Sequence, residues 1–111
     1  MSSTDDSTLV LVLTTLGFDA DASTLARTLV EERLAACVNV LAPMTSFYRW
    51  KGTIEQDREQ QLVIKTTRDS LPALEARLSV LHPYELPELV VLSASASAAY
   101  AAWVGFSVRD A

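Results

Sequence analysis

The feature that most limits the fold of this chain is the segment between residues 37 and 67, which reads as two long strands joined by one turn. The first arm is expected to run from Cys37 to Trp50 as one long strand, with a bulge or an edge near Pro43. Lys51-Gly52 supplies the turn, and Thr53 to Thr67 is expected to return as the second arm. Arms of about 14 residues would be roughly 46 Å long, whereas a compact domain of this size has a radius of gyration of about 13 Å. The hairpin should therefore overhang its own domain and extend the sheet of a neighbouring copy.

The rest of the chain alternates between strand and helix patterns. The expected elements are a strand over Leu9 to Thr15, a helix over Ala22 to Leu34, a helix over Leu71 to Leu81, a strand over Glu88 to Ser93 and a helix over Ala96 to Val108. Together with the hairpin they give the split βαββαβ order followed by a C-terminal helix. This order predicts an α+β sandwich, in which helices cover one face of an antiparallel sheet.

The first and last strands are apolar without alternation, at Leu9 to Leu13 and Leu89 to Leu92. A strand with one face in water would alternate apolar and polar residues, so both faces of these strands should be covered. Half of the residues are hydrophobic, and a domain this small buries only about two-thirds of its unfolded surface. We therefore expect a homo-oligomer, in which another copy covers the open face of the sheet.

Length and composition bound the remaining possibilities. The 111 residues are enough for one domain, expected over residues 9–111, preceded by a polar and disordered tail at residues 1–8. The apolar runs are too short to span a membrane, and no secretory signal precedes them, so we expect a cytoplasmic protein. A formal net charge of −5 repels phosphate backbones and argues against nucleic-acid partners.

Few side chains here could carry chemistry. With three glycines and one histidine, the chain has no glycine-rich phosphate loop, no Ser-His-Asp set and no His-Glu-x-x-His motif, so we expect no enzymatic activity. Cys37 is either a small buried hydrophobe or a metal ligand, and His82 either contacts the end of a helix or binds metal. Glu59 lies on the same strand face as Lys65, on either a solvated edge or a cleft between copies.

Five blocks of the sequence occur in an order that resembles the CutA divalent-cation tolerance family, over about residues 9 to 109. They are Glu32-Arg33-Leu34-Ala35-Ala36-Cys37-Val38-Asn39, Tyr48-Arg49-Trp50-Lys51-Gly52, Glu59 with Ile64-Lys65-Thr66, His82-Pro83-Tyr84-Glu85-Leu86-Pro87-Glu88, and Tyr100 with Trp103. The resemblance implies a ferredoxin-like fold assembled as a homotrimer through the long hairpin.

The resemblance also implies a role in tolerance to copper or another divalent cation. None of these ions is expected to be an obligatory cofactor. Its metal contacts would fall on Cys37, His82 and, more loosely, Glu59. Chains of this family resemble the trimeric PII signalling proteins, so the alternative is a module that senses a small molecule in clefts between subunits. An exposed Trp at a hairpin tip more often anchors a subunit contact than a ligand. We therefore expect a subunit interface at Tyr48, Trp50, Gly52 and Trp103.

Overall fold

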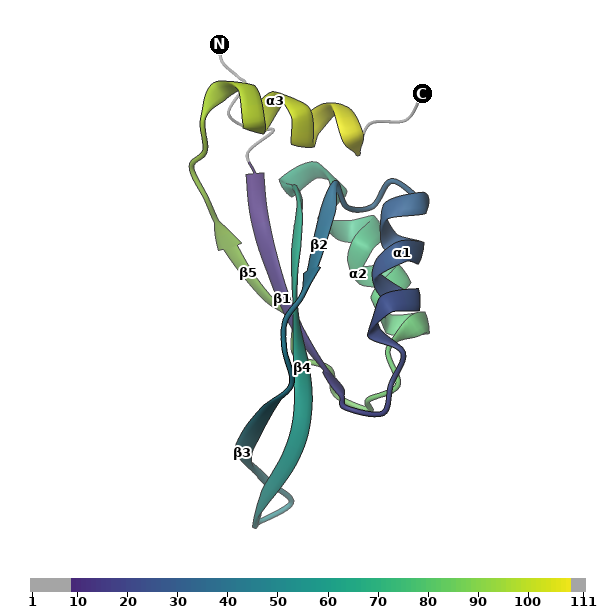
Figure 1. Ribbon diagram of the computed structural model, residues 1–111, viewed down its shortest axis with the longest axis vertical. Coiled ribbons are helices and arrows are strands. Elements are labelled where there is room, and N and C mark those ends of the chain that lie inside the picture. Colours follow the sequence, from purple (N-terminus) through teal and green to yellow (C-terminus); the bar gives the residue numbers. More distant parts are fainter. Residues whose placement is uncertain (1–8, 109–111) are drawn as a thin grey trace.

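The long hairpin sets the shape of the molecule, which measures 49 × 24 × 23 Å along its principal axes (Figure 1). The computed structural model describes residues 9–108, so the tail predicted at residues 1–8 lies outside the described residues. The elements are β1 (Leu9–Gly17), α1 (Ala22–Glu31), β2 (Cys37–Val40), β3 (Met44–Trp50), β4 (Thr53–Thr67), α2 (Leu71–Leu81), β5 (Val90–Ser93) and α3 (Ala98–Ser107). A short 3-10 turn, Arg68–Ser70, joins β4 to α2.

The strands form one antiparallel sheet in the order β2-β4-β1-β5, with β3 paired to the first half of β4. In the central pair, the whole of β1 pairs with the second half of β4, from Leu9 opposite Thr67 to Gly17 opposite Glu59. Helices α1 and α2 lie on one face of the sheet, and α3 crosses its end (Figure 1). This is the ferredoxin-like βαββαβ arrangement with an added C-terminal helix, as the sequence predicts.

The first arm of the hairpin is not the single strand that we expected. It breaks at residues 41–43 into β2 and β3, which pair with β4 on either side of the break. Val40 lies opposite Leu62 and Met44 opposite Glu59, so three residues of the first arm span two of β4. Pro43 explains the position of the break, since proline has no backbone N–H to continue the ladder. The second arm, β4, has the predicted bounds.

Helix α1 ends three residues earlier than the apolar spacing predicts. It begins where Asp21 accepts a hydrogen bond from the backbone N–H of Thr24, at 3.0 Å. It ends at Glu31 because Arg33 has a φ of 60°, in the left-handed region that terminates helices. The strand expected from Glu88 begins at Val90, where its pairing with β1 starts, and the last helix begins at Ala98 after the cap Ser97.

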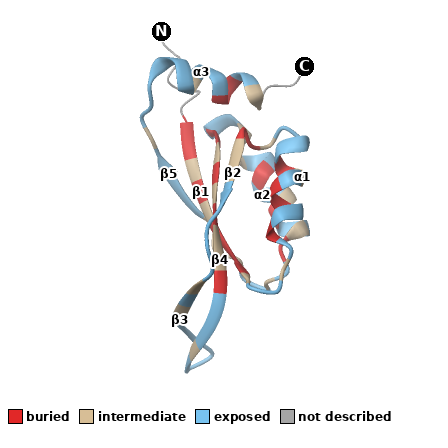
Figure 2. Cartoon of the chain, in the orientation of Figure 1, coloured by how far each residue is buried: buried red, intermediate tan, exposed pale blue. Residues whose placement is uncertain are grey.

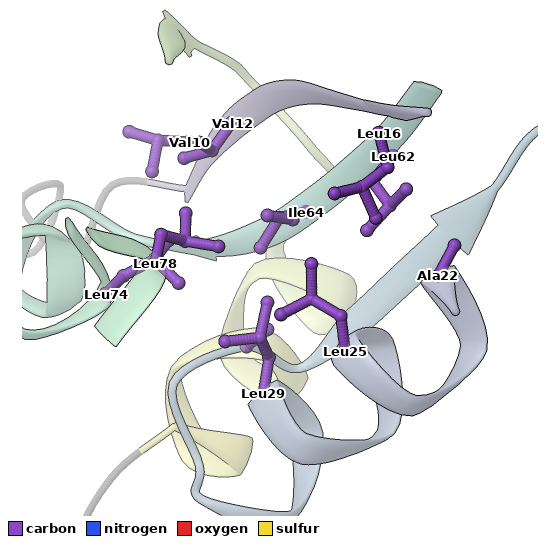
Figure 3. Packing of buried hydrophobic residues seen from close by; sticks show 11 residues of the cluster. Val10, Val12, Leu16, Ala22, Leu25, Leu29, Leu62, Ile64, Leu74 and Leu78 are labelled. Carbon is purple, nitrogen blue, oxygen red and sulfur yellow. The ribbon is translucent and has the colours of Figure 1, made fainter. Parts of the chain in front are cut away.

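The core lies between the helices and the sheet (Figure 3). Its main members are Val10, Val12 and Leu16 of β1, Leu62 and Ile64 of β4, Leu25 and Leu29 of α1, and Leu74 and Leu78 of α2. A smaller cluster of Leu9, Ala36 and Val104 packs α3 against the end of the sheet. Both helices thus bury their apolar faces on one side of the sheet only.

The opposite, open face of the sheet carries apolar residues with no helix over them. Leu11 and Leu13 alternate with the core residues of β1 and are half-buried, and their partners Leu92 and Val90 on β5 are exposed. Figure 2 shows β5 exposed over its whole length. Both strands thus present apolar residues on both faces, and the predicted cover of the open face by another copy stays a prediction.

One buried hydroxyl in the core makes a stability prediction. Thr14 is fully buried, and its Oγ1 has no hydrogen-bond partner among the described residues. Replacing Thr14 by Val should raise the free energy of unfolding by about 1 kcal/mol, because an unpaired buried hydroxyl is removed at nearly constant shape. Thr66→Val is the matched control: its hydroxyl donates to the Leu34 carbonyl at 2.8 Å, so its loss should destabilise by about 1 kcal/mol. Urea denaturation of the parent and both variants measures the free energies of unfolding. A loss of stability in Thr14→Val would contradict the conclusion that the Thr14 hydroxyl is unpaired.

Candidate functional site

A cleft of about 830 Å³ opens between the β3–β4 hairpin and the loop that connects α2 to β5. Its lining residues are Thr15, Met44, Ser46, Tyr48, Trp50, Glu59, Gln61, Pro83, Tyr84, Glu85, Leu86, Pro87 and Glu88. Glu59 and Gln61 are alternate residues of β4 and therefore share one face of the strand. The core residues Leu62 and Ile64 point to the helix side, so the cleft lies on the open face.

His82 fixes the start of the loop to the sheet. It caps α2, and its backbone N–H donates to the Leu78 carbonyl at 2.8 Å. The ring is buried: Nε2 lies 2.7 Å from the Thr15 carbonyl oxygen, and Nδ1 accepts the backbone N–H of Tyr84 at 3.1 Å. A carbonyl can only accept and a backbone N–H can only donate, so Nε2 is the donor and Nδ1 is the acceptor. Both ring nitrogens are thus used within the chain.

Tyr84 reaches from this loop to β4. Its hydroxyl donates to Oε2 of Glu59 at 2.6 Å, and the Glu59 side chain is only 7% exposed. The Tyr84 hydroxyl passes close to the backbone of β1, at van der Waals distance (3.4 Å) from where a Cβ of Gly17 would lie. Burial, together with the hydrogen bond to Glu59, raises the pKa of Tyr84 well above its usual range. The phenol therefore stays protonated at neutral pH and remains a hydrogen-bond donor to Glu59.

Two further hydrogen bonds hold the walls of the cleft. The Tyr48 hydroxyl of β3 donates to Asp57 of β4, and this bond raises the pKa of Tyr48 to about 12. Gln61 donates from Nε2 to Oε2 of Glu88 at 3.3 Å, which ties the far end of the loop to the sheet. The first bond is local to the β3–β4 hairpin, and the second joins side chains 27 residues apart.

The charge of the cleft has one sign. Three of its lining residues are carboxylates, Glu59, Glu85 and Glu88, and none of the lining residues is basic. In the described part of the chain the ion pairs join Arg27 to Glu31 and Arg77 to Glu32, which lie elsewhere. A cleft lined in this way attracts cations and repels anions.

The structure does not bring the three predicted metal ligands together. Cys37 is half-buried at the start of β2 and pairs in register with Lys65. Glu59 precedes Lys65 by six residues on β4, which separates it from Cys37 by roughly 20 Å along the strand. His82 lies near Glu59 through Tyr84, but its ring nitrogens are occupied. Within residues 9–108, no group of three His, Cys, Asp or Glu side chains could hold a metal ion.

The residues predicted for a subunit interface lie at opposite ends of the molecule. Tyr48, Trp50 and Gly52 are on the hairpin, and Trp103 is on α3, where its ring contacts that of Tyr100. Tyr48, Trp50 and Trp103 are exposed in the single chain. Lys51 and Gly52 both have positive φ, at 51° and 83°, which is the geometry of a tight two-residue hairpin turn.

The contact between Tyr84 and Glu59 was not predicted from the sequence, since no residue spacing links Tyr84 to Glu59 twenty-five positions earlier. The available signal was the block His82 to Pro87, in which two prolines stiffen a loop with a histidine, a tyrosine and a glutamate directly after a helix. Such a loop is typical of a segment that positions side chains, but its partner comes only from the fold.

Comparison with known proteins identifies close relatives. Residues 10–107 match the family model of the CutA1 divalent ion tolerance protein. The chain is 49% identical to the divalent-cation tolerance protein CutA of Thermus thermophilus over 82 residues. This match covers 74% of this chain and 80% of that protein. Among solved structures, CutA from Synechococcus elongatus PCC7942 superposes with a TM-score of 0.86 at 43% identity, covering 93% of this chain and 92% of that one. The PII-like protein CutA from Nostoc sp. PCC 7120 superposes with a TM-score of 0.84 at 35% identity, covering 90% and 97%.

Proposed function

Because this chain belongs to the CutA1 divalent ion tolerance family, we propose that it contributes to tolerance of divalent cations by binding them directly, as a cytoplasmic and non-catalytic homotrimer. The observation that supports cation binding is the charge of the cleft: its lining has three carboxyl side chains and no basic residue and so concentrates cations, whereas no three metal-ligating side chains converge within residues 9–108. Carboxylate oxygens bind divalent metals, and for a given set of such ligands copper is bound most tightly. No helix among residues 9–108 is long and apolar enough to cross a membrane.

The proposed trimer accounts for the apolar surface that the single chain leaves exposed. Val90 and Leu92 on the open face of β5 and Phe47 and Ile54 on the hairpin are all more than 40% exposed. A hairpin that projects from one chain can pair with the free edge of β5 in a neighbour and cover this surface. The acidic cleft, which the hairpin borders, would then lie at a subunit boundary.

Calorimetric titration with copper, zinc and manganese tests cation binding. Glu59→Gln should weaken the binding of each metal by about tenfold or more, because it removes a ligand charge while an amide oxygen can still accept from Tyr84. Glu75→Gln is the control, an exposed acid on α2 on the other side of the sheet. Cys37→Ser separates thiolate from carboxylate binding, since only copper and zinc should respond to it. Equal affinity in the parent and in Glu59→Gln would contradict the proposed site.

A second function is favoured by the size of the cleft. A volume of about 830 Å³ is far larger than a metal ion needs and falls within the range of about 300–1,000 Å³ that is typical of small-molecule sites. A PII-like module that binds a small molecule between subunits would use such a space, and a PII-like protein is among the structural neighbours.

A further inference from the structure

Glu59 is a buried carboxyl group that forms no ion pair within the described chain. Its side chain is 7% exposed, and its hydrogen-bond partner is the neutral phenol of Tyr84. Neither ion pair of residues 9–108 involves it. A buried charge without a counter-charge is costly, so such a group is typical of a site that receives a cation from outside the chain.

Aromatic side chains line the same cleft as the Glu59 carboxyl group. Tyr84 bonds to it, and Tyr48 and Trp50 line the hairpin wall of the same cleft together with the thioether of Met44. Aromatic faces attract organic cations, with Trp the strongest of the three side chains. They also bury apolar surface, which a hydrated metal ion does not offer.

We propose that this cleft binds a small organic cation, an ammonium or guanidinium group attached to an apolar body, with the charged group at Glu59 and the body along the hairpin wall at Tyr48. The volume of about 830 Å³ admits a molecule of this kind. The carboxylates Glu85 and Glu88 at the loop side add to the selection for positive charge. The same charges disfavour nucleotides and other phosphate-bearing ligands, which narrows the class of molecule that a PII-like role would involve.

Three matched probes test the proposal: phenethylammonium, its neutral analogue 2-phenylethanol and the anion 3-phenylpropionate. The intrinsic fluorescence of a Trp103→Phe background reports on the cleft, because Trp50 lines it and is then the remaining tryptophan of the two in the sequence. We expect phenethylammonium to bind at least about tenfold more tightly than the neutral analogue, and the anion not to bind. Equal binding of the ammonium and the alcohol, or no binding of the ammonium, would overturn the proposal.

Variants of the acidic residues then test whether the ammonium group of the probe binds at Glu59. Glu59→Gln should weaken phenethylammonium binding by about tenfold or more, while Glu75→Gln should leave it unchanged. Glu88→Gln, a half-buried residue at the cleft, serves as the second variant if Glu59→Gln does not fold, and a smaller loss is expected there. An undiminished affinity in both cleft variants would place the probe elsewhere. Since the probes contain no metal, this result is independent of the metal titration, and either can fail without the other.

Discussion

Replacing His82 by Ala is expected to lower the free energy of unfolding by about 3 kcal/mol, with or without metal. The substitution removes a buried ring, leaves the Thr15 carbonyl without its donor and takes away the acceptor of the Tyr84 amide. His82→Asn should recover about 1 kcal/mol of this loss, because a shorter amide side chain can restore one of the two bonds.

The measurement is urea denaturation of the parent and both variants at one protein concentration, in EDTA and again in zinc. A structural histidine predicts the same loss in both buffers. A loss that appears only in zinc would instead show that His82 is a metal ligand, and that the two ring hydrogen bonds are not what makes it important.

Replacing Leu92 by Asp is expected to dissociate the proposed trimer, so that the mass falls from about 36 kDa, three times the chain mass, to 12.1 kDa. Leu92 is 46% exposed on the open face of β5, so a single chain can carry aspartate there. A covered aspartate without a partner would lose its hydration, at a cost of several kcal/mol per interface.

Light scattering at micromolar concentration measures the mass, and circular dichroism checks that the chain remains folded. Val80→Asp is the matched control, because Val80 is 72% exposed on α2 on the other side of the sheet and its replacement should leave the mass unchanged. A trimeric Leu92→Asp, or a monomeric parent, would contradict the proposed assembly.

The fold followed from the sequence wherever a local pattern determines structure. The bounds of β4 and α2 were predicted correctly, because the turn at Lys51-Gly52 and the pair His82-Pro83 mark their ends. A bulge or an edge was predicted near Pro43 within one long strand, but the chain breaks there into β2 and β3, and the size of this break depends on the register against β4, which no local pattern contains. The end of α1 was missed because Arg33 takes a left-handed φ that arginine has no intrinsic preference for.

The candidate site was less predictable, because it is made of contacts between distant segments. Glu59 was predicted as a site residue, but its partner Tyr84 and the link between Gln61 and Glu88 depend on where the loop after α2 returns to the sheet. Cys37 and His82 were grouped by ligand chemistry alone. Cys37 lies opposite Lys65 on β4. His82 contacts the carbonyl of Thr15, which lies opposite Gln61, four residues earlier on β4. The strand register therefore keeps Cys37 and His82 apart.

The two-residue turn at Lys51-Gly52 has a consequence for the order in which the chain folds. It closes a short loop, so β3 and β4 can pair within microseconds and before any distant contact forms. Strand β1 must wait, because its partner β4 lies some fifty residues later in the chain, and closing that loop costs far more entropy. During synthesis the N-terminal strand would therefore emerge long before its partner, and we expect the hairpin to form before the β1–β4 pair.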